Sequence, residues 1–371
     1  NMREGNTIMN TKRQRIYVDM HVLQSVPPSC INRDDTGSPK TAIYGGSQRA
    51  RISSQAWKKA MRDMFEELFP AEKLGVRSKK VAKLIAESIK VQNPQVSDDD
   101  AMELARKVLS LVDIKLKDDQ TDALFFISYA QTKALAEMAI ERSEDLLKKK
   151  QPSDLKKLAK SILQSQPGID IALFGRMLAS DPTLNTDACS QVAHAISTHA
   201  VHNEFDYFTA TDDLPDDEHA GAAHIGITEY NSSLLYRYAT IAVHELYESQ
   251  RDDTVDAVIG FLDSFVRSMP TGRQNSFANR TLPEALLVTI RVDQPLNLVG
   301  AFESPVSSEG KGYYGASAQK LVEHTERLYS NFAGEPLYSY VVGVELAKLG
   351  ECLNFQQLKE SLAEDLSREI G

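Results

Sequence analysis

Residues 33–62 read RDDTGSPKTAIYGGSQRARISSQAWKKAMR and contrast in charge with the rest of the chain. The chain as a whole is acidic, with a formal net charge of -10 at pH 7. This stretch contains only two acids, Asp34 and Asp35, against the cations Arg33, Lys40, Arg49, Arg51, Lys58, Lys59 and Arg62. A basic strip within an acidic chain indicates a local site for anions.

The end of the stretch predicts an amphipathic helix. Residues 52–69 place apolar side chains at the spacing of one buried helical face: Trp57, Met61, Met64, Phe65 and Leu68. Ser53 or Ser54 is a suitable N-cap, because a serine hydroxyl can accept a hydrogen bond from a free backbone N–H group.

The first turns of this helix carry cations where acids are usual. Lys58, Lys59 and Arg62 lie roughly opposite the apolar face, and no acid occurs before Asp63. Together with Gln55, the serine hydroxyls and the free N–H groups, they favour a phosphate site. Arg49 and Arg51, which follow a predicted Gly45-Gly46 hairpin turn, support this interpretation. The alternative is a solvated basic face on an ordinary helix.

Composition restricts the class of protein. A chain of 371 residues with 42% hydrophobic content can form two or three folded domains. No apolar run approaches the ~20 residues of a membrane span, and the first residues given show no signal-peptide pattern. The cysteines (Cys30, Cys189 and Cys352) are far apart and have no CxxC spacing. We therefore expect a cytoplasmic protein without membrane contact or a zinc site, and leave residues 1–13 outside the fold.

Periodicity predicts strands interleaved with helices around one helical block. Strands are expected at 15–25, 41–44, 48–52, 168–178, 191–201, 225–243 (with a turn near Asn231), 284–292 and 338–346, and helices within 71–166 and at 253–269, 318–332 and 354–370. For 191–201 a helix is the alternative. Residues 202–224, with Phe205, Tyr207 and Phe208, are expected to form a protruding β-loop with the next strand. The pattern favours an α+β fold built on a split βαβ sheet. A doubly wound parallel sheet is the alternative, but no GxGxxG or GxxxxGK[ST] follows a strand.

Other candidate sites are weaker. His194, His199 and His202 cluster near Glu204, but the spacing is not HExxH, so structural or solvent-facing histidines are expected. Asp34 and Asp35 could hold Mg²⁺ for RNA cleavage, although pairing with arginines or capping of their loop is favoured. No Ser-His-Asp or Cys-His arrangement is identifiable. We expect no catalytic residue, metal or cofactor.

Several segments resemble one known family. HVLQSVPPSCINRDD (21–35), AIYGGSQRARISSQAWKKAMR (42–62), GIDIALFGRM (168–177), AHAISTHAV (193–201), DYFTATDDL (206–214) and HIGITEYNSSLLYRYA (224–239) are similar to the CasC-type backbone subunit of type I-E CRISPR Cascade complexes. The resemblance runs in order through residues 15–243, whereas the helical block and the last third are less distinctive.

The resemblance implies a hand-shaped fold. Its palm is a modified RNA-recognition-motif (ferredoxin-like) unit, with an inserted helical fingers domain and a β-hairpin thumb. The implied boundaries are 14–70, 167–203 and 225–371 for the palm, 71–166 for the fingers and 204–224 for the thumb.

The resemblance also implies a non-catalytic role. Copies polymerise along CRISPR RNA and present the guide to target DNA, beside a large subunit, small subunits and two subunits that cap the ends of the RNA. A separate helicase-nuclease cuts the DNA. The alternative from a different class is a metal-dependent endoribonuclease, related to type III backbone subunits, that uses Asp34 or Asp35.

The resemblance implies that the basic strip binds RNA, and it adds further RNA-binding residues at matching positions. Arg176 and Met177 are implied at a kink in the guide, and Phe208 at the thumb. The complete set of expected RNA-binding residues is Arg33, Lys40, Arg49, Arg51, Ser53, Gln55, Lys58, Lys59, Arg62, Arg176, Met177 and Phe208.

Overall fold

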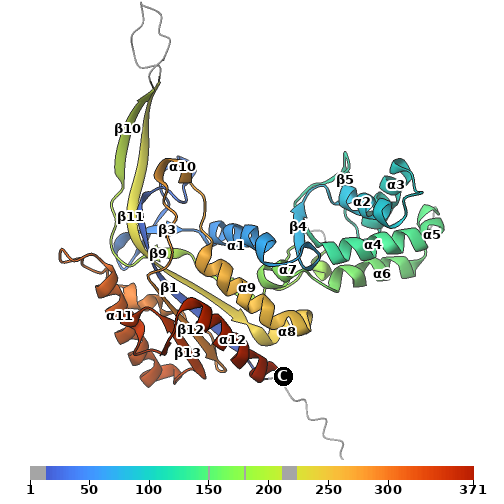
Figure 1. Cartoon of the computed structure of the whole chain (residues 1–371). Helices are drawn as coiled ribbons and strands as arrows, with labels where there is room; N and C mark the ends of the chain where they lie inside the picture. Colours follow the sequence, from blue (N-terminus) through green and yellow to red (C-terminus); the bar gives the residue numbers. More distant parts are fainter. Residues whose placement is uncertain (1–13, 149–150, 179–180, 211–223) are drawn as a thin grey trace, which may run out of the picture.

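The computed structural model describes residues 14–148, 151–178, 181–210 and 224–371. A single large sheet organises the chain, with strand order β14-β13-β12-β1-β11-β9-β3-β2 (Figure 1). Its strands are β1 (Tyr17–Ser29), β2 (Thr41–Tyr44), β3 (Ser47–Ile52), β8 (Ser190–Val192), β9 (Ala195–Ser197), β10 (Glu204–Ala210), β11 (His224–Ala242), β12 (Ala285–Arg291), β13 (Tyr338–Val342) and β14 (Glu351–Cys352). The strands expected at 284–292 and 338–346 are therefore present with shorter bounds, whereas the one strand expected at 191–201 is replaced by the two short strands β8 and β9.

The centre of the sheet is a split βαβ unit, as predicted. β1 pairs with β11 on one side and β12 on the other, antiparallel to both. β11 and β12 are therefore parallel, and the helices α8 (Val243–Gln250) and α9 (Thr254–Arg267) connect them. We call this sheet and the helices packed on it the palm.

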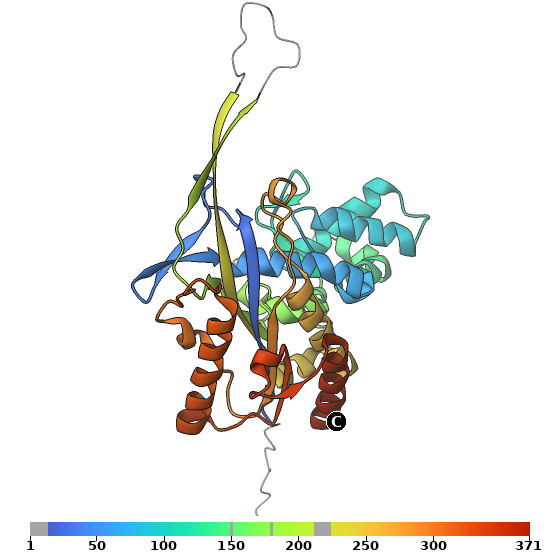
Figure 2. The same cartoon turned by 60° about the vertical axis from the view of Figure 1, so that its left-hand side comes forward.

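Helices cover both faces of the palm sheet (Figure 2). One face packs on α1, α7, α8, α9 and α12, and the other on η4 and α11. Their bounds are α1 (Ser54–Leu68), α7 (Ile169–Phe174), α8 (Val243–Gln250), α9 (Thr254–Arg267), α10 (Gln274–Phe277), η4 (Leu298–Phe302), α11 (Tyr314–Leu328) and α12 (Phe355–Ile370).

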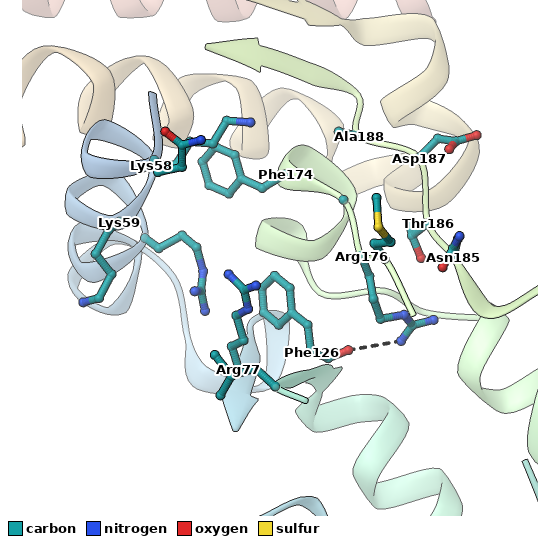
Figure 3. Close-up of a pocket in the computed structure, with 15 residues that line it drawn as sticks. Lys58, Lys59, Arg77, Phe126, Phe174, Arg176, Asn185, Thr186, Asp187 and Ala188 are labelled. Carbon is teal, nitrogen blue, oxygen red and sulfur yellow. Dashed lines mark hydrogen bonds between the residues drawn. The ribbon is translucent and has the colours of Figure 1, made fainter. Parts of the chain in front are cut away.

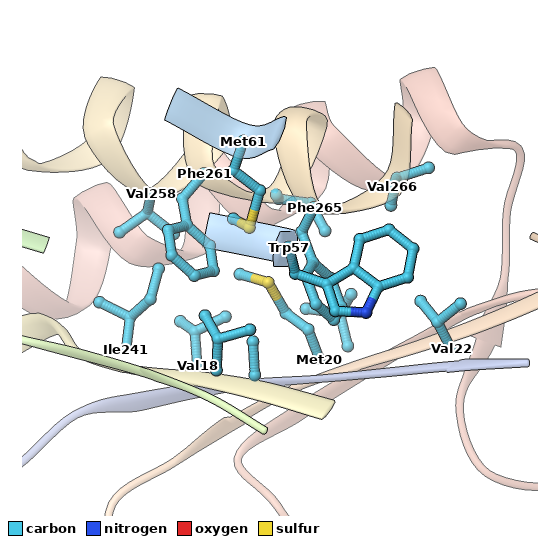
Figure 4. Packing of buried hydrophobic residues seen from close by; sticks show 14 of the residues in the cluster. Val18, Met20, Val22, Trp57, Met61, Ile241, Val258, Phe261, Phe265 and Val266 are labelled. Carbon is cyan, nitrogen blue, oxygen red and sulfur yellow. The ribbon is translucent and has the colours of Figure 1, made fainter. Parts of the chain in front are cut away.

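The predicted amphipathic helix α1 is confirmed. Its N-cap is Ser53, whose hydroxyl accepts from the backbone N–H of Ala56. Trp57 and Met61 are fully buried against the sheet and α9 (Figure 4). Burying such side chains stabilises a fold by about 1.5–3 kcal/mol each. The opposite face of α1 is therefore fixed towards solvent.

The inserted block forms the fingers, with a core of its own. It contains α2 (Val81–Gln92), α3 (Asp98–Leu111), α4 (Tyr129–Glu141), α5 (Ser143–Leu147) and α6 (Ser153–Gln164), together with β4 (Gly75–Ser78), β5 (Leu116–Lys117), β6 (Gln120–Thr121) and β7 (Phe125–Ser128). The expectation of helices throughout was wrong at β4 and β7, which pair with each other at the root of the fingers. All four residues of β7 are buried, so no alternation marked it as a strand.

The strand predicted at 168–178 is also wrong. Residues 169–174 form the helix α7, which ends at Gly175 with a positive φ of 79°. Its first five residues, 169–173, are all buried. A short segment that is buried on every side has no helical periodicity to distinguish it from a strand.

β10 and the first half of β11 form a long hairpin, the thumb, which projects from the palm (Figure 1). The turn expected near Asn231 is absent, because β11 is one strand with two successive partners. Tyr230 pairs with Glu204 of β10, and Asn231 with Ser29 of β1. The acidic thumb tip, within residues 211–223, lies outside the described residues.

The Gly45-Gly46 turn is confirmed between β2 and β3, where both glycines have positive φ.

None of the helices in the described ranges has the length and apolar character needed to cross a membrane.

Candidate nucleic-acid interface

A cavity of about 470 Å³ lies between α1 and the root of the fingers (Figure 3). Three walls enclose it: α1, the β4–β7 pair, and the segment from the end of α7 to β8. It is lined by Gln55, Lys58, Lys59, Arg62, Arg77, Leu124, Phe126, Phe174, Gly175, Arg176, Met177, Asn185, Thr186, Asp187 and Ala188. The folding of the chain thus brings together the end of the basic strip and the expected kink residue Met177.

The cations of the α1 wall differ in their freedom. Lys58 is half-buried, with Nζ 5.8 Å from the centroid of the Phe174 ring. Burial lowers its pKa from the ordinary lysine value. Lys59 is exposed and pairs with Asp63 one turn later, Nζ to Oδ1 at 2.5 Å. An exposed pair of this kind is weak, so a phosphate can compete for the lysine.

Arg62 is held in place on two sides. Its guanidinium lies over the Phe126 ring, 4.4 Å from the centroid, and its Nε is 3.4 Å from Oδ2 of Asp170. Burial raises the pKa of Asp170 to about 6, although Arg62 and two backbone N–H groups act in the opposite direction. Arg62 is therefore a partly exposed cation in a fixed orientation.

The opposite wall contributes residues that the sequence did not indicate. Arg77 of β4 reaches the cavity, as does Leu124, which is 50% exposed. The sequence around Arg77 was predicted to be helical. Only its assignment to a strand would have shown that the Arg77 side chain points into the cavity.

Met177, an expected site residue, is 86% exposed, which is unusual for an apolar side chain and suits contact with another molecule.

A second group of cations lies beside the β2–β3 hairpin. Arg51 donates from Nε to the carbonyl of Thr41, and its Nη1 is 3.2 Å from Nδ1 of His194. Burial, with Arg51 and Lys40 nearby, lowers the pKa of His194. Lys40 and Arg51 also line one small pocket. Arg33 is exposed at the start of the adjoining loop.

Two of the expected RNA-binding residues, Arg49 and Arg176, are buried and bonded within the protein. Arg49 has 0% exposure, and its Nη groups donate to the carbonyls of Ser197, Phe302 and Glu303. Arg176 has 5% exposure and donates to the carbonyls of Phe126, Leu163 and Leu184 and to the side chain of Gln131.

Burial lowers the pKa of Arg176 to about 10. Because both guanidinium groups are buried and their Nη groups donate to acceptors inside the protein, neither arginine presents its charge to a ligand. The Ser53 hydroxyl is likewise engaged as the cap of α1, whereas Gln55 is exposed.

Phe208 lies on the thumb and not at the cavity. It pairs with Gly226 across the hairpin, and a Cβ built on Gly226 would lie 2.3 Å from Cζ of Phe208. The glycine is thus needed for the phenyl ring to lie flat across β11. Within one chain, Met177 lines the cavity and Phe208 does not.

The other candidates are engaged in local structure. Oδ1 of Asp34 accepts from Thr36 and from the backbone N–H of Ser38, which caps the loop and lowers the pKa of Asp34. His199 is buried and stacks on Tyr313 with ring centroids 3.6 Å apart. Across the described ranges, no three His, Cys, Asp or Glu side chains are grouped so that they could hold a metal ion.

The split βαβ palm, helical fingers and protruding thumb define the chain as having the fold of a subunit of CRISPR surveillance complexes. A chain of a solved structure described as "CRISPR RNA-guided surveillance complex, pre-nicking" is 31% identical, with a TM-score of 0.82 over 94% of this chain and 99% of its own. A chain of a second "CRISPR RNA-guided surveillance complex" is 27% identical, with a TM-score of 0.70 and the same coverage.

The family model of CT1975-like proteins matches residues 18–368. The chain therefore belongs to the CT1975-like protein family. A comparison with curated proteins gave no match.

Proposed function

We propose that this protein is a non-catalytic backbone subunit of a type I-E Cascade surveillance complex in the cytoplasm, and that it binds CRISPR RNA through the cavity beside α1. The observation that carries the proposal is the convergence of Lys58, Lys59, Arg62 and Arg77 on one open cavity of an otherwise acidic chain. Similarity to chains of two RNA-guided complexes supports it.

The chemistry of the cavity fits a guide held by its backbone. Cations bind phosphates without regard to sequence, and this leaves the base edges free for pairing with target DNA. Lys40 and Arg51 extend the cationic surface towards the thumb. The exposed side chains of Met177 and Leu124 can press on bases, because apolar side chains interrupt stacking in single-stranded complexes.

Assembly follows from the same proposal. Several copies bind side by side along one RNA, with the palm and fingers holding phosphates and the thumb hairpin of β10 and the first half of β11 reaching the neighbouring copy. Phe208 of one copy and Met177 of another then act on the same kink. The remaining subunits are the large subunit, the small subunits and the two subunits at the RNA ends.

The first experiment is purification of the protein from cells that express a CRISPR array. We expect RNA of one defined size to co-purify with multimers of the protein, and these multimers should dissociate when the RNA is removed. Co-purified RNA of no defined size would contradict the proposal. So would the same multimer in RNA-free protein.

The same preparation tests the endoribonuclease alternative. Incubation of bound RNA with Mg²⁺ should leave its length unchanged. Cleavage that disappears in Asp34→Ala or Asp35→Ala would establish the alternative instead.

A further inference from the structure

Asp170 lies where the fingers join the palm. Its side chain is 4% exposed, and Oδ1 accepts from the backbone N–H groups of Gly75, at 2.9 Å, and Ile171, at 3.0 Å. Gly75 begins β4, where the chain enters the fingers, and Ile171 belongs to α7, which follows them. With Oδ2 facing Arg62, one carboxylate contacts the entry, the exit and the palm helix α1.

These contacts decide which part of Arg62 is available to a ligand. Asp170 faces Nε, and Phe126 covers one face of the guanidinium. Within the described ranges, the Nη groups of Arg62 have no protein acceptor. They line the cavity and leave a pair of donors for a phosphate, the geometry that arginine uses for such groups.

We propose that Asp170 is a positioning residue for the RNA contact of Arg62, and that RNA binding there is coupled to uptake of a proton by Asp170. The inference rests on the proposed function. A phosphate bound to the Nη groups adds negative charge close to a buried carboxylate, and a nearby like charge disfavours ionisation. The RNA complex therefore binds a proton more tightly than the free protein does.

The free protein is already close to this transition. Burial holds the pKa of Asp170 at about 6, so a further rise on RNA binding falls within the neutral range. Arg62 is the charged group that contacts the carboxylate. Other charged or titratable side chains on the elements packed against α7 are Lys58, Lys59, Asp63, Glu66 and Glu67 of α1, Arg77 of β4, and His244, Glu245, Tyr247 and Glu248 of α8.

The test is the affinity for a short single-stranded RNA of arbitrary sequence at pH 6 and pH 8, at one ionic strength. All variants are made in a His194→Gln parent, so that this histidine does not add its own titration. If binding raises the pKa of Asp170 by one unit, affinity increases roughly fivefold from pH 8 to pH 6. Asp170→Asn, which keeps an oxygen for Gly75 and Ile171, should abolish this difference.

Asp63→Asn is the matched control. Asp63 also pairs with a cation of the cavity, Lys59, but its side chain is 59% exposed and is screened by solvent. This variant should keep the fivefold difference. Arg62→Gln, which removes the cation through which the two events are coupled, should bind more weakly and lose the difference.

Each outcome decides between the two claims. RNA binding by Asp170→Asn with the pH dependence of the parent overturns the inference alone. If Asp170→Asn does not fold, as judged by thermal unfolding, an unchanged pH dependence in Arg62→Gln overturns it. Absence of RNA binding by the parent at both pH values overturns the proposed function, and the inference with it.

Discussion

The guanidinium of Arg237 lies on the indole of Trp57, with Cζ 3.6 Å from the ring centroid. Arg237 is fully buried, donates to Oε1 of Gln24 at 2.6 Å and to the carbonyl of Phe265, and has its pKa lowered by burial to about 9. This cation therefore joins α1, α9, β1 and β11. The helix that carries the candidate interface is anchored to the sheet through its one tryptophan.

We expect Arg237→Ala to destabilise the protein by about 3 kcal/mol, because it leaves two buried acceptors without a donor and creates a cavity. Urea unfolding measures this loss. Arg251→Ala is the control, since that arginine is 60% exposed and its removal should change stability by less than about 0.5 kcal/mol. Equal effects would show that Arg237 is not an anchor.

Asp19 predicts a pH dependence of stability. It accepts from the hydroxyl of Tyr238 at 2.9 Å and the backbone N–H of Leu296 at 2.8 Å, and burial raises its pKa to about 6. The folded carboxyl keeps its proton at pH values where the unfolded one, with a pKa of about 4, has lost it. The free energy of unfolding therefore falls as pH rises through this window.

Asp19→Asn removes this contribution. The stability of the wild-type protein minus that of the variant should fall by about 2 kcal/mol between pH 4 and pH 7.5. Urea unfolding at the two pH values measures the change. A difference that stays constant would mean that folding does not raise the pKa of this carboxyl.

Removal of single cavity cations should weaken RNA binding in a way that is independent of sequence. We expect Lys58→Ala and Arg62→Ala each to reduce the slope of log K against log salt by about 0.7, the loss of one contact with single-stranded RNA. Lys133→Ala, at an exposed position of α4 outside the cavity, should leave the slope unchanged. Losses that depend strongly on RNA sequence would contradict contact with phosphates.

The buried arginines should behave in the opposite way. Arg176→Ala leaves the carbonyls of Phe126, Leu163 and Leu184 without this donor, so we expect a lower melting temperature. The salt slope of the folded fraction should not change. A reduced slope without loss of stability would return Arg176 to the RNA interface.

Met177 should affect the shape of the bound guide more than its affinity. Because the side chain is 86% exposed, Met177→Ala should change stability by less than about 0.5 kcal/mol. Combined with Phe208→Ala, it should reduce RNA affinity only modestly, while nucleotide reactivity loses its regular pattern of exposed positions. Survival of that pattern in the double variant would exclude both side chains as wedges.

Local patterns in the sequence predicted the elements whose faces differ in polarity. α1 and α12 each have one buried face and one exposed face, and the Gly45-Gly46 turn has residues suited to positive φ, so each was found. α7 and β7 are buried on all sides, and this removes the periodicity that separates helix from strand.

For the candidate site, the sequence predicted the position of some cations but did not reveal that others are buried. Lys58 and Arg62 lie on the face of α1 opposite its buried apolar residues, as the helical periodicity predicted, because those apolar residues fix the orientation of the helix. Arg49 and Arg176 were not distinguishable from them, because their acceptors are distant in sequence. Arg49 donates to residues 197, 302 and 303, and local sequence contains no trace of such partners.

The junction at Asp170 also bears on how such chains can diverge. A Cβ built on Gly168 would lie 2.8 Å from the carbonyl carbon of Leu74, so the two ends of the fingers insertion touch. When the two ends of an insertion are in contact, its length does not change the distance between the palm segments on either side of it. Fingers of other lengths could then be exchanged at this point as modules, while the palm sheet keeps its register.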